Sequence, residues 1–399
     1  MKLKQTIAVS ILAIAGLTSC EKDLYDPTQE KPVTKVEDLN IADDFDWKMS
    51  QSSLCNIQSG NSTVTLSIYQ NEACTSENLL AIVPVLPGSN PKLPLSVLST
   101  NQEVYITYQN SANETIKTAA SIVDGNINFT VPNQATARST RAGEIEENGI
   151  ITTFYPNFEG GTVMFEDNYP ELGDYDFNDF VAKYMVEIHT DAKTNYVKDV
   201  NLYLSVRAIG AIKKYIPHFR IISYGTSYVE SIDSNKGIYD DFNPQLIPDD
   251  KGKIVIALNG AENKFGEEYL NTKEGTKAIP TRKLDTTIRF KEGTCDIAFL
   301  DIDKFDLFLA SADHKEEIHI LGNGPAFKIE GYGNASYYKD SKTNLVWGIN
   351  IPEVINHTYE QANFLEAYPE FAKWAEGNYS ATNKWYKNGV SKFLYPMNY

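Results

Sequence analysis

Strand-like alternation of apolar residues is the feature that most restricts the folds open to this chain. In three early segments, 62–69, 103–108 and 126–131, apolar residues recur at every second position between Gly, Asn or Pro. A period of two places one face of a strand against a core and the other in water. The 24 tyrosines and 18 phenylalanines suit such strands, because aromatic residues are enriched in sheets. We therefore predict a mainly β protein with β-sandwich architecture.

The first 20 residues have the pattern of a lipoprotein signal peptide. Two lysines in MKLKQ precede the apolar run TIAVSILAIAGLT, which is too short to span a bilayer as a stable anchor. The run ends on LTSC at residues 17–20, which resembles the bacterial lipobox and places the Cys20 thiol to accept lipid. We expect cleavage before Cys20 and a membrane partner reached through the lipid, because several acyl chains together anchor a protein firmly.

The residues that follow Cys20 bear on the destination of the protein. Glu21, Lys22 and Asp23 resemble the export signal of Bacteroidetes lipoproteins that reach the outer face of the outer membrane. We therefore expect an outer-membrane lipoprotein exposed at the cell surface, with a periplasm-facing anchor as the alternative. The formal net charge of -17 argues against a nucleic-acid partner, because phosphate binding needs concentrated Lys and Arg.

Length and composition divide the chain into segments. A chain of 399 residues exceeds what one core normally serves, so two domains are expected, joined by a polar stretch that reads as a linker. The predicted segments are a signal peptide at 1–19, a lipidated flexible tether at 20–44, a small Ig-like or transthyretin-like sandwich at 45–132, a linker at 133–149, and a larger jelly-roll-like sandwich at 150–399. A short helical region is expected around Pro369, where apolar residues recur at three-to-four-residue spacing.

Cysteine use is sparse for an exported chain. With Cys20 consumed by lipid, Cys55, Cys74 and Cys295 remain, and an odd number cannot all pair. A disulfide between Cys55 and Cys74 is one possibility, although sequence alone cannot judge its geometry. Cys295 is expected to be a small buried hydrophobe.

The segment GTVMFEDNYPELGDYDFNDFV at residues 161–181 closely resembles the signature of the LruC-type domain of bacterial outer-membrane lipoproteins. FDLFL at 305–309 with EIHI at 317–320, and the Trp-containing stretch from residue 346 to 386, resemble later parts of the same domain. The resemblance covers about residues 150–399, and it implies an exported, β-rich domain with no assigned reaction. The stretch LGNGPA at 321–326 follows the family's turn only loosely.

An acidic loop between two strands is the strongest candidate site. Asp174, Asp176 and Asn178 fall at alternate positions, as in the first half of an EF-hand loop, and hard Ca²⁺ prefers such oxygen ligands. Tyr175 and Phe177 would then point away and pack against the sandwich. Further negative charge is available from Glu166, Asp167 and Asp179. The alternative is a metal-free turn in which the carboxylates cap backbone N–H groups.

The sequence lacks the common local patterns of catalytic sites. The five histidines lack the spacing of a helical zinc site, and no nucleophile elbow or phosphate-binding Gly-rich loop is present, so neither zinc hydrolysis nor a nucleotide partner is supported. We therefore predict a non-catalytic surface lipoprotein that binds a glycan, the matrix or an envelope protein. The alternatives are an envelope scaffold or fibre component, and a carbohydrate-active hydrolase, whose two carboxylates leave no local signature.

Overall fold

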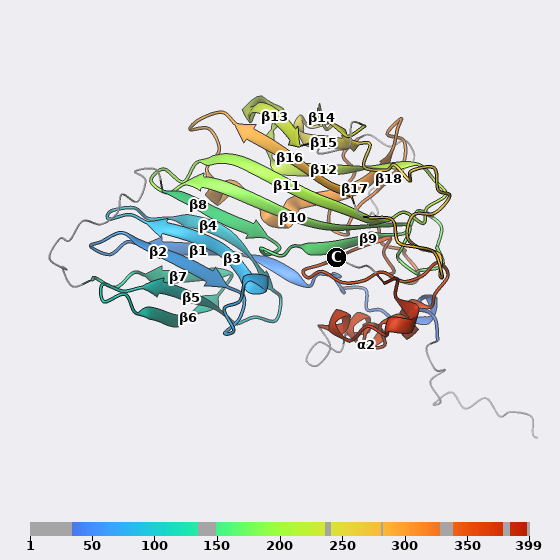
Figure 1. The fold of residues 1–399 in the computed structure, drawn as a ribbon, viewed down its shortest axis with the longest axis horizontal. Coiled ribbons are helices and arrows are strands. Elements are labelled where there is room, and N and C mark those ends of the chain that lie inside the picture. Colours follow the sequence, from blue (N-terminus) through green and yellow to red (C-terminus); the bar gives the residue numbers. More distant parts are fainter. Residues whose placement is uncertain are drawn as a thin grey trace, which may run out of the picture. The chain divides into compact units, whose positions relative to one another are not determined.

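The computed structural model describes residues 34–134, 149–235, 241–280, 282–327, 338–377 and 384–396. The signal peptide, Cys20 and most of the predicted linker lie outside these ranges. The described strands form two sheets, and the mainly β prediction is thereby confirmed (Figure 1).

The first seven strands follow one hydrogen-bonded path, β3-β2-β5-β6-β7-β1-β4, in which β1 and β7 run parallel. The segments predicted to alternate form β2, β5 and β7. Their bounds are β1 (Ser50–Gln58), β2 (Val64–Tyr69), β3 (Leu79–Val85), β4 (Lys92–Leu98), β5 (Glu103–Gln109), β6 (Thr115–Val123) and β7 (Asn126–Thr130).

The same sheet continues into the second half of the chain. Its strands there are β8 (Ile150–Tyr155), β9 (Gly161–Phe165), β10 (Phe180–Asp191), β11 (Val197–Ala208), β13 (Val229–Asn235), β16 (Arg282–Phe290) and β19 (Gly348–Ile351). The join is the pairing of β3 with β8, where Ala81 faces Thr153 and Ile82 faces Thr152. The predicted boundary at 133–149 therefore does not separate two compact units, because residues 34–399 form one.

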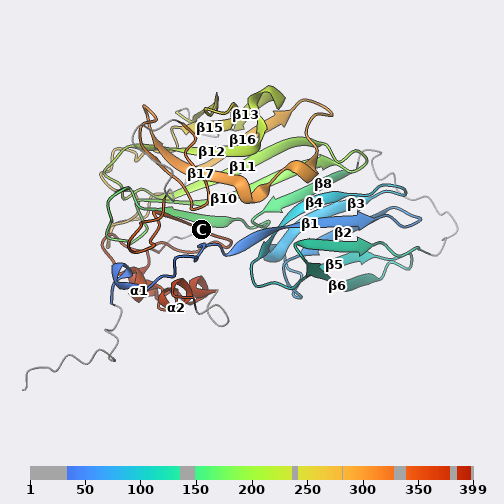
Figure 2. The ribbon, with the colours of Figure 1, turned by 180° about the vertical axis from the view of Figure 1, so that it is seen from behind.

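A second sheet has five strands in the order β14-β15-β12-β17-β18. Their bounds are β12 (Tyr215–Gly225), β14 (Asn243–Pro248), β15 (Lys253–Asn259), β17 (Phe305–Ser311) and β18 (Glu317–Ile318). β17 and β18, which contain the 305–309 and 317–318 stretches, pair as an antiparallel hairpin. One hydrophobic cluster unites side chains from both sheets, among them Leu202, Phe219 and Leu307, and this shared core makes the fold a β-sandwich (Figure 2).

The helical elements are short. They are α1 (Phe364–Ala367), α2 (Phe371–Ala375) and the 3-10 turns η1 (Val36–Asp38), η2 (Ser76–Asn78), η3 (Thr226–Tyr228), η4 (Ile297–Phe299), η5 (Ile302–Lys304), η6 (Trp385–Asn388) and η7 (Ser391–Phe393). Phe371 and Trp374 are buried, so their role is core packing, as the spacing around Pro369 predicts. Among the described residues, no helix is both long and apolar enough to cross a bilayer.

The predicted tether needs correction at its C-terminal end. Val36, Leu39 and Ile41 are buried, and Phe45 stacks edge-on against Trp374 with ring centroids 5.0 Å apart. Residues 34–44 are therefore packed against the C-terminal helices. Their apolar side chains belong to a second hydrophobic cluster, which also contains Phe371 and Trp374. Only residues 20–33, outside the described ranges, remain as a predicted tether.

The disulfide between Cys55 and Cys74, one possibility from the sequence, is not formed, because both cysteines are free. Cys55 is buried in β1, whereas Cys74 lies in the loop after β2 with its Sγ 3.7 Å from the carbonyl oxygen of Asn71. β5, β6 and β7 lie between β2 and β1 in the sheet, which explains why closeness in sequence does not bring the thiols together. Cys295 is buried, as predicted.

Candidate functional site

The acidic loop connects two neighbouring antiparallel strands. Glu166 follows β9 directly and Asp179 precedes β10 directly, and Phe165 faces Phe180 in the register of this pair. The loop therefore begins and ends at the same point of the sheet. The Asp167 N–H donates to Asp179 Oδ2 at 2.7 Å and closes the base of the loop.

Alternation along the loop separates the aromatic from the polar side chains. Tyr175 and Phe177 have positive φ angles of 54° and 53°, and both are fully buried in the second cluster. Their N–H groups turn toward Glu166 and donate to Oε2 at 3.2 Å and Oε1 at 2.6 Å. Successive N–H groups aimed at one point form an anion-binding nest, here occupied by the Glu166 carboxylate. The predicted packing of both rings is confirmed.

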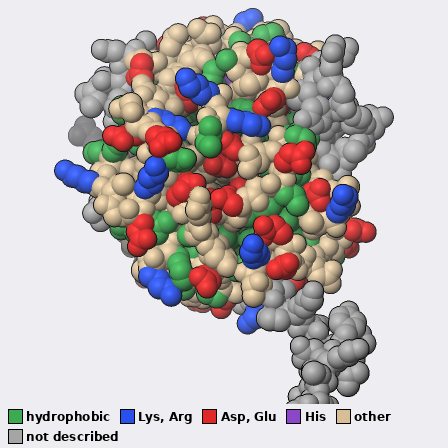
Figure 3. Space-filling view, turned by 90° about the vertical axis from the view of Figure 1, so that its right-hand side faces the viewer, with side chains coloured by type: hydrophobic (Ala, Val, Ile, Leu, Met, Phe, Trp, Pro, Cys, Tyr) green, Lys and Arg blue, Asp and Glu red, His purple; other side chains and the backbone are tan. Residues whose placement is uncertain are grey.

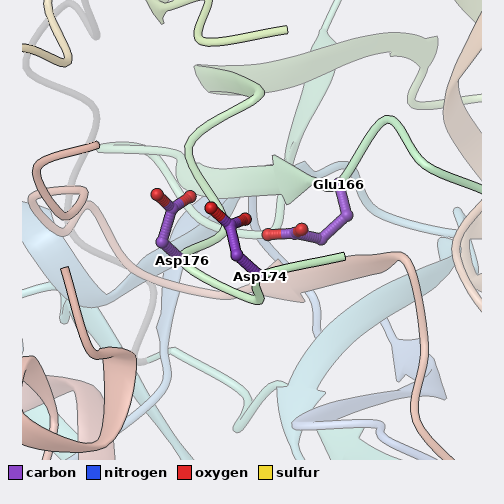
Figure 4. Close-up of side chains that lie close together, drawn as sticks. All are labelled: Glu166, Asp174 and Asp176. Atoms are coloured by element: carbon purple, nitrogen blue, oxygen red, sulfur yellow. The ribbon is translucent and has the colours of Figure 1, made fainter. Parts of the chain in front are cut away.

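Three carboxylates converge in the loop. One ligand oxygen each of Glu166, Asp174 and Asp176 lies within 4.8 Å of the other two. Figure 4 shows the Glu166 side chain pointing toward Asp174, and Asp176 lying beside Asp174 on the same turn. Figure 3 shows acidic side chains gathered near the centre of one face of the molecule, with Lys and Arg more dispersed.

Asn178 supplies a second observation at the same place. Its side chain is 1% exposed, and neither Oδ1 nor Nδ2 has a hydrogen-bond partner. A buried amide without partners costs free energy, so such a group in a native fold is a candidate for binding a water or an ion. The Asn178 N–H itself donates to Asp176 Oδ1 at 3.1 Å, which fixes the turn.

Glu360 is a member of the site that sequence reasoning missed. Its side chain interacts with the Thr272 side chain, and a Cβ built on Gly210 would lie 3.1 Å from Glu360 Oε2 and 2.4 Å from Asn178 Oδ1. The carboxylate of Glu360 and the amide of Asn178 therefore border the same small space beside Gly210. Glu360 comes from the segment after β19, about 180 residues downstream of the loop, and no local spacing signals it.

Burial and mutual repulsion dominate the electrostatics of the cluster. Burial, reinforced by the charge of Asp174, raises the pKa of Asp176 to about 9. Burial and the charge of Asp167 raise the pKa of Asp179 to about 7. The pKa of Glu166 is raised for the same reasons, despite its two N–H donors. Each carboxylate therefore resists ionisation unless positive charge is added.

Positive side chains do not neutralise this charge. Across the described residues, no Lys or Arg forms an ion pair with the site's carboxylates, which belong to Glu166, Asp167, Asp174, Asp176, Asp179 and Glu360. The charges of Asp167 and Asp179 act on the ammonium group of Lys264, but this group donates its hydrogen bonds to the carbonyls of Ala211 and Glu268. The donor set is made of oxygen atoms only, which suits a hard cation such as Ca²⁺ rather than zinc or copper.

Of the six predicted ligands, Glu166, Asp174 and Asp176 converge, whereas Asp167, Asn178 and Asp179 lie in the same loop outside that group of three. Glu166, Asp176 and Asp179 already accept backbone N–H groups, as the metal-free alternative expected. Asp167 accepts the Lys213 N–H at 3.1 Å and ties the loop to the segment after β11. Backbone capping thus accounts for part of the loop, and it leaves the side-chain amide of Asn178 and the exposed Asp174 without a structural explanation.

The histidines are held by structural partners. His319 is fully buried between Asp306 Oδ2 and Glu317 Oε2, each 2.6 Å from a ring nitrogen. His189 stands on the sheet surface between Asp199 and Glu187. His218 and His357 are buried, and burial lowers the pKa of each to about 4.

Comparison with known proteins places part of this site in a defined family region. Residues 195–386 match a family model described as "Domain of unknown function (DUF4842)". The matched span contains Gly210 and Glu360, while the acidic loop precedes it. No curated protein matches the chain.

A solved structure named "Putative lipoprotein from Bacteroides ovatus" shares the fold. It aligns with a TM-score of 0.63 at 19% identity, covering 84% of this chain and 99% of the other. At this identity the likeness shows the fold alone. Neither match names an LruC-type domain, so that resemblance stays a prediction.

Proposed function

We propose that this protein is a non-catalytic lipoprotein of the outer membrane that binds an extracellular ligand and carries a calcium-stabilised loop. The observation that carries the calcium part is the buried, unpartnered Asn178 amide in the loop where the carboxylates of Glu166, Asp174 and Asp176 converge, with no ion pair to any Lys or Arg that the structure describes. Six to eight oxygen ligands surround a typical calcium ion, and the carboxylate and amide side chains of this loop supply oxygen atoms of that kind.

Bound calcium would tie three distant segments together. Asp174, Asp176 and Asn178 would contribute from the β9–β10 loop, and Glu360 from the segment after β19. Gly210, which follows β11, provides the space between Asn178 and Glu360. The Gly210 N–H also donates to the Asn178 carbonyl at 3.1 Å, so the third segment is already in contact with the loop. The cation would therefore fix the connection between the two central strands and the C-terminal part.

Gly210 offers a steric test of this ligand set. We expect Gly210→Ala to weaken calcium binding by about tenfold or more, because a methyl group 2.4 Å from Asn178 Oδ1 displaces a ligand oxygen. Gly324→Ala is the matched control, since nothing lies within 4 Å of its added Cβ. Calcium affinity measured by calorimetry checks both variants. Equal affinity in Gly210→Ala and Gly324→Ala would remove Asn178 and Glu360 from the ligand set.

The lipid anchor is supported by the leader and by the name of the Bacteroides ovatus protein that shares the fold. We expect Cys20→Ala to move the protein from the membrane fraction to the soluble fraction, because no second anchor is proposed. Cys295→Ala is the control, since that cysteine is buried in the core and cannot accept lipid. Cell fractionation followed by immunoblotting is the measurement. Retention of Cys20→Ala in salt-washed membranes would contradict the anchor, and added protease on intact cells reports surface exposure.

A binding role is separated from the hydrolase alternative by product analysis. His189 and His319 are held by carboxylates, and His218 and His357 are buried, which supports a protein in which these four imidazoles do not act as acid–base catalysts. We expect a glycan array probed with the purified protein to give retained ligands and no new reducing ends. Release of new reducing ends would contradict the non-catalytic role and show that the protein is a glycosidase.

A further inference from the structure

A solvent-open groove lies on the larger sheet, on the face opposite the main core, with a volume of about 680 Å³. Lys183 on β10, Ser205 on β11 and Lys283 on β16 form its floor. Lys183 faces Ser205 and Ser205 faces Lys283 in the registers of these adjacent strands. The three side chains therefore form one row across the sheet, with a hydroxyl between two ammonium groups (Figure 1 labels the strands).

A third cation lines the same groove. The β10–β11 register shifts between Val181 and Ala182, so Arg207 occupies an irregular position on β11. Such bulges re-aim side chains. The buried Arg207 guanidinium reaches the groove wall, where Nη1 donates to the Ile355 carbonyl at 2.5 Å.

The walls of the groove are built from fixed segments. Asn157 Nδ2 donates to the Pro352 carbonyl at 2.7 Å and holds the turn after β8 against the segment after β19. Glu353 is engaged by an ion pair with Lys387. Glu159 and Glu77 stand at the rim. The groove thus offers carboxylates on its sides and, on its floor, two ammonium groups that form no ion pair with a described residue.

The floor is positively charged in a protein whose net charge is -17. Lys183 and Lys283 form no ion pair with any described carboxylate. Burial lowers the pKa of Lys183, and the charges of Arg207 and Lys283 act in the same direction, while Glu159 opposes them. An anion above Ser205 would relieve this repulsion and accept hydrogen bonds from both ammonium groups.

We propose that this groove binds an acidic saccharide, with a carboxylate or sulfate group between Lys183 and Lys283 above Ser205. A volume of about 680 Å³ falls in the range of small-molecule sites and holds roughly two or three sugar rings. Glu159 and Glu77 would accept hydrogen bonds from sugar hydroxyls. The lining residues that the structure describes include no aromatic ring, so recognition by charge replaces stacking. This inference rests on the proposed binding role and names its ligand class.

Calorimetry on the complete lipidated protein tests the groove, in calcium and in a detergent without a sugar headgroup. The probes are trigalacturonic acid, a sulfated galactose oligosaccharide and neutral galactotriose. We expect an acidic probe to bind and galactotriose to give no heat. Lys183→Gln and Lys283→Gln should each weaken binding by about tenfold, because each removes a charged hydrogen-bond donor. Lys251→Gln, in the exposed β14–β15 turn outside the groove, should bind as the unmodified protein does.

A second measurement needs no variant. Raising the salt concentration should weaken binding of the acidic probe to the unmodified protein, because salt screens partly exposed charges. Preference between the carboxylate and sulfate probes identifies the anion. Failure of both acidic probes to bind, equal binding of galactotriose, or unchanged affinity in both lysine variants would each overturn the inference. These outcomes leave the Cys20 and calcium measurements unaffected, so they are distinguishable from failure of the proposed function.

Discussion

Protein stripped of calcium should lose thermal stability as the pH rises from about 5 to about 8.5. Burial and neighbouring negative charge raise the pKa of Asp176 to about 9 and that of Asp179 to about 7. An unfolded aspartate titrates near pH 3.9, so the folded state holds these protons more tightly than the unfolded state. Their stabilising contribution is complete below about pH 4 and is lost as the pH rises through the folded values.

The expected effect is large. For each such group, the free energy of unfolding falls by about 1.4 kcal/mol for every pH unit between its unfolded and folded pKa values. For Asp176, this loss corresponds to a fall in melting temperature on the order of 10 °C between about pH 5 and about pH 8.5. Calcium should flatten the profile, because the cation replaces the protons. Asp176→Asn in chelator should also flatten it, since the amide cannot ionise. A steep fall that is identical in Asp176→Asn and the unmodified protein would assign the effect to other groups.

His319→Ala should destabilise the fold by about 3–5 kcal/mol, because removing one member of a buried ion network leaves the others unpaired. His319 lies between Asp306 and Glu317, all three fully buried, and stacks on Phe308 with ring centroids 4.2 Å apart. Burial opposes the imidazolium, but the two carboxylates raise the pKa of His319 above its usual value. Glu317 also accepts the Ala326 N–H, so the network holds the loop after β18.

His189 provides a control with the same chemistry in a different environment. It also sits between two carboxylates, Asp199 and Glu187, but its side chain is 31% exposed. His189→Ala should therefore cost less than about 1 kcal/mol, as is usual for exposed pairs. Urea denaturation in calcium measures both variants. A smaller loss in His319→Ala than in His189→Ala would show that the buried network does not hold the second sheet.

Local pattern predicted the strands and the loop well. Alternation located β2, β5 and β7, and it also placed Tyr175 and Phe177 in the core, because both outcomes depend on the period of the backbone. The convergence of acidic residues in the loop could be predicted for the same reason. They lie within 14 residues of one another, between two strands that pair.

Long-range contacts could not be predicted from the sequence. The pairing of β3 with β8 depends on which strand edges meet, and it joins segments that the polar stretch at 133–149 suggested were separate. Glu360 joins the site through the fold of the C-terminal segment, and residues 34–44 are packed because Phe45 meets Trp374 far downstream. Each case needs the tertiary arrangement, on which local periodicity carries no information.

Calcium titration of the purified protein by calorimetry tests the central claim most directly. The unmodified protein should bind calcium with measurable heat, and Asp176→Asn should abolish or greatly weaken that binding. Asp313→Asn is the matched control, because this carboxylate lies in the exposed β17–β18 turn and pairs with Lys315. The account predicts calcium binding in the control equal to that of the unmodified protein. Absence of binding heat in the unmodified protein, with no change in melting temperature between calcium and chelator, would contradict it.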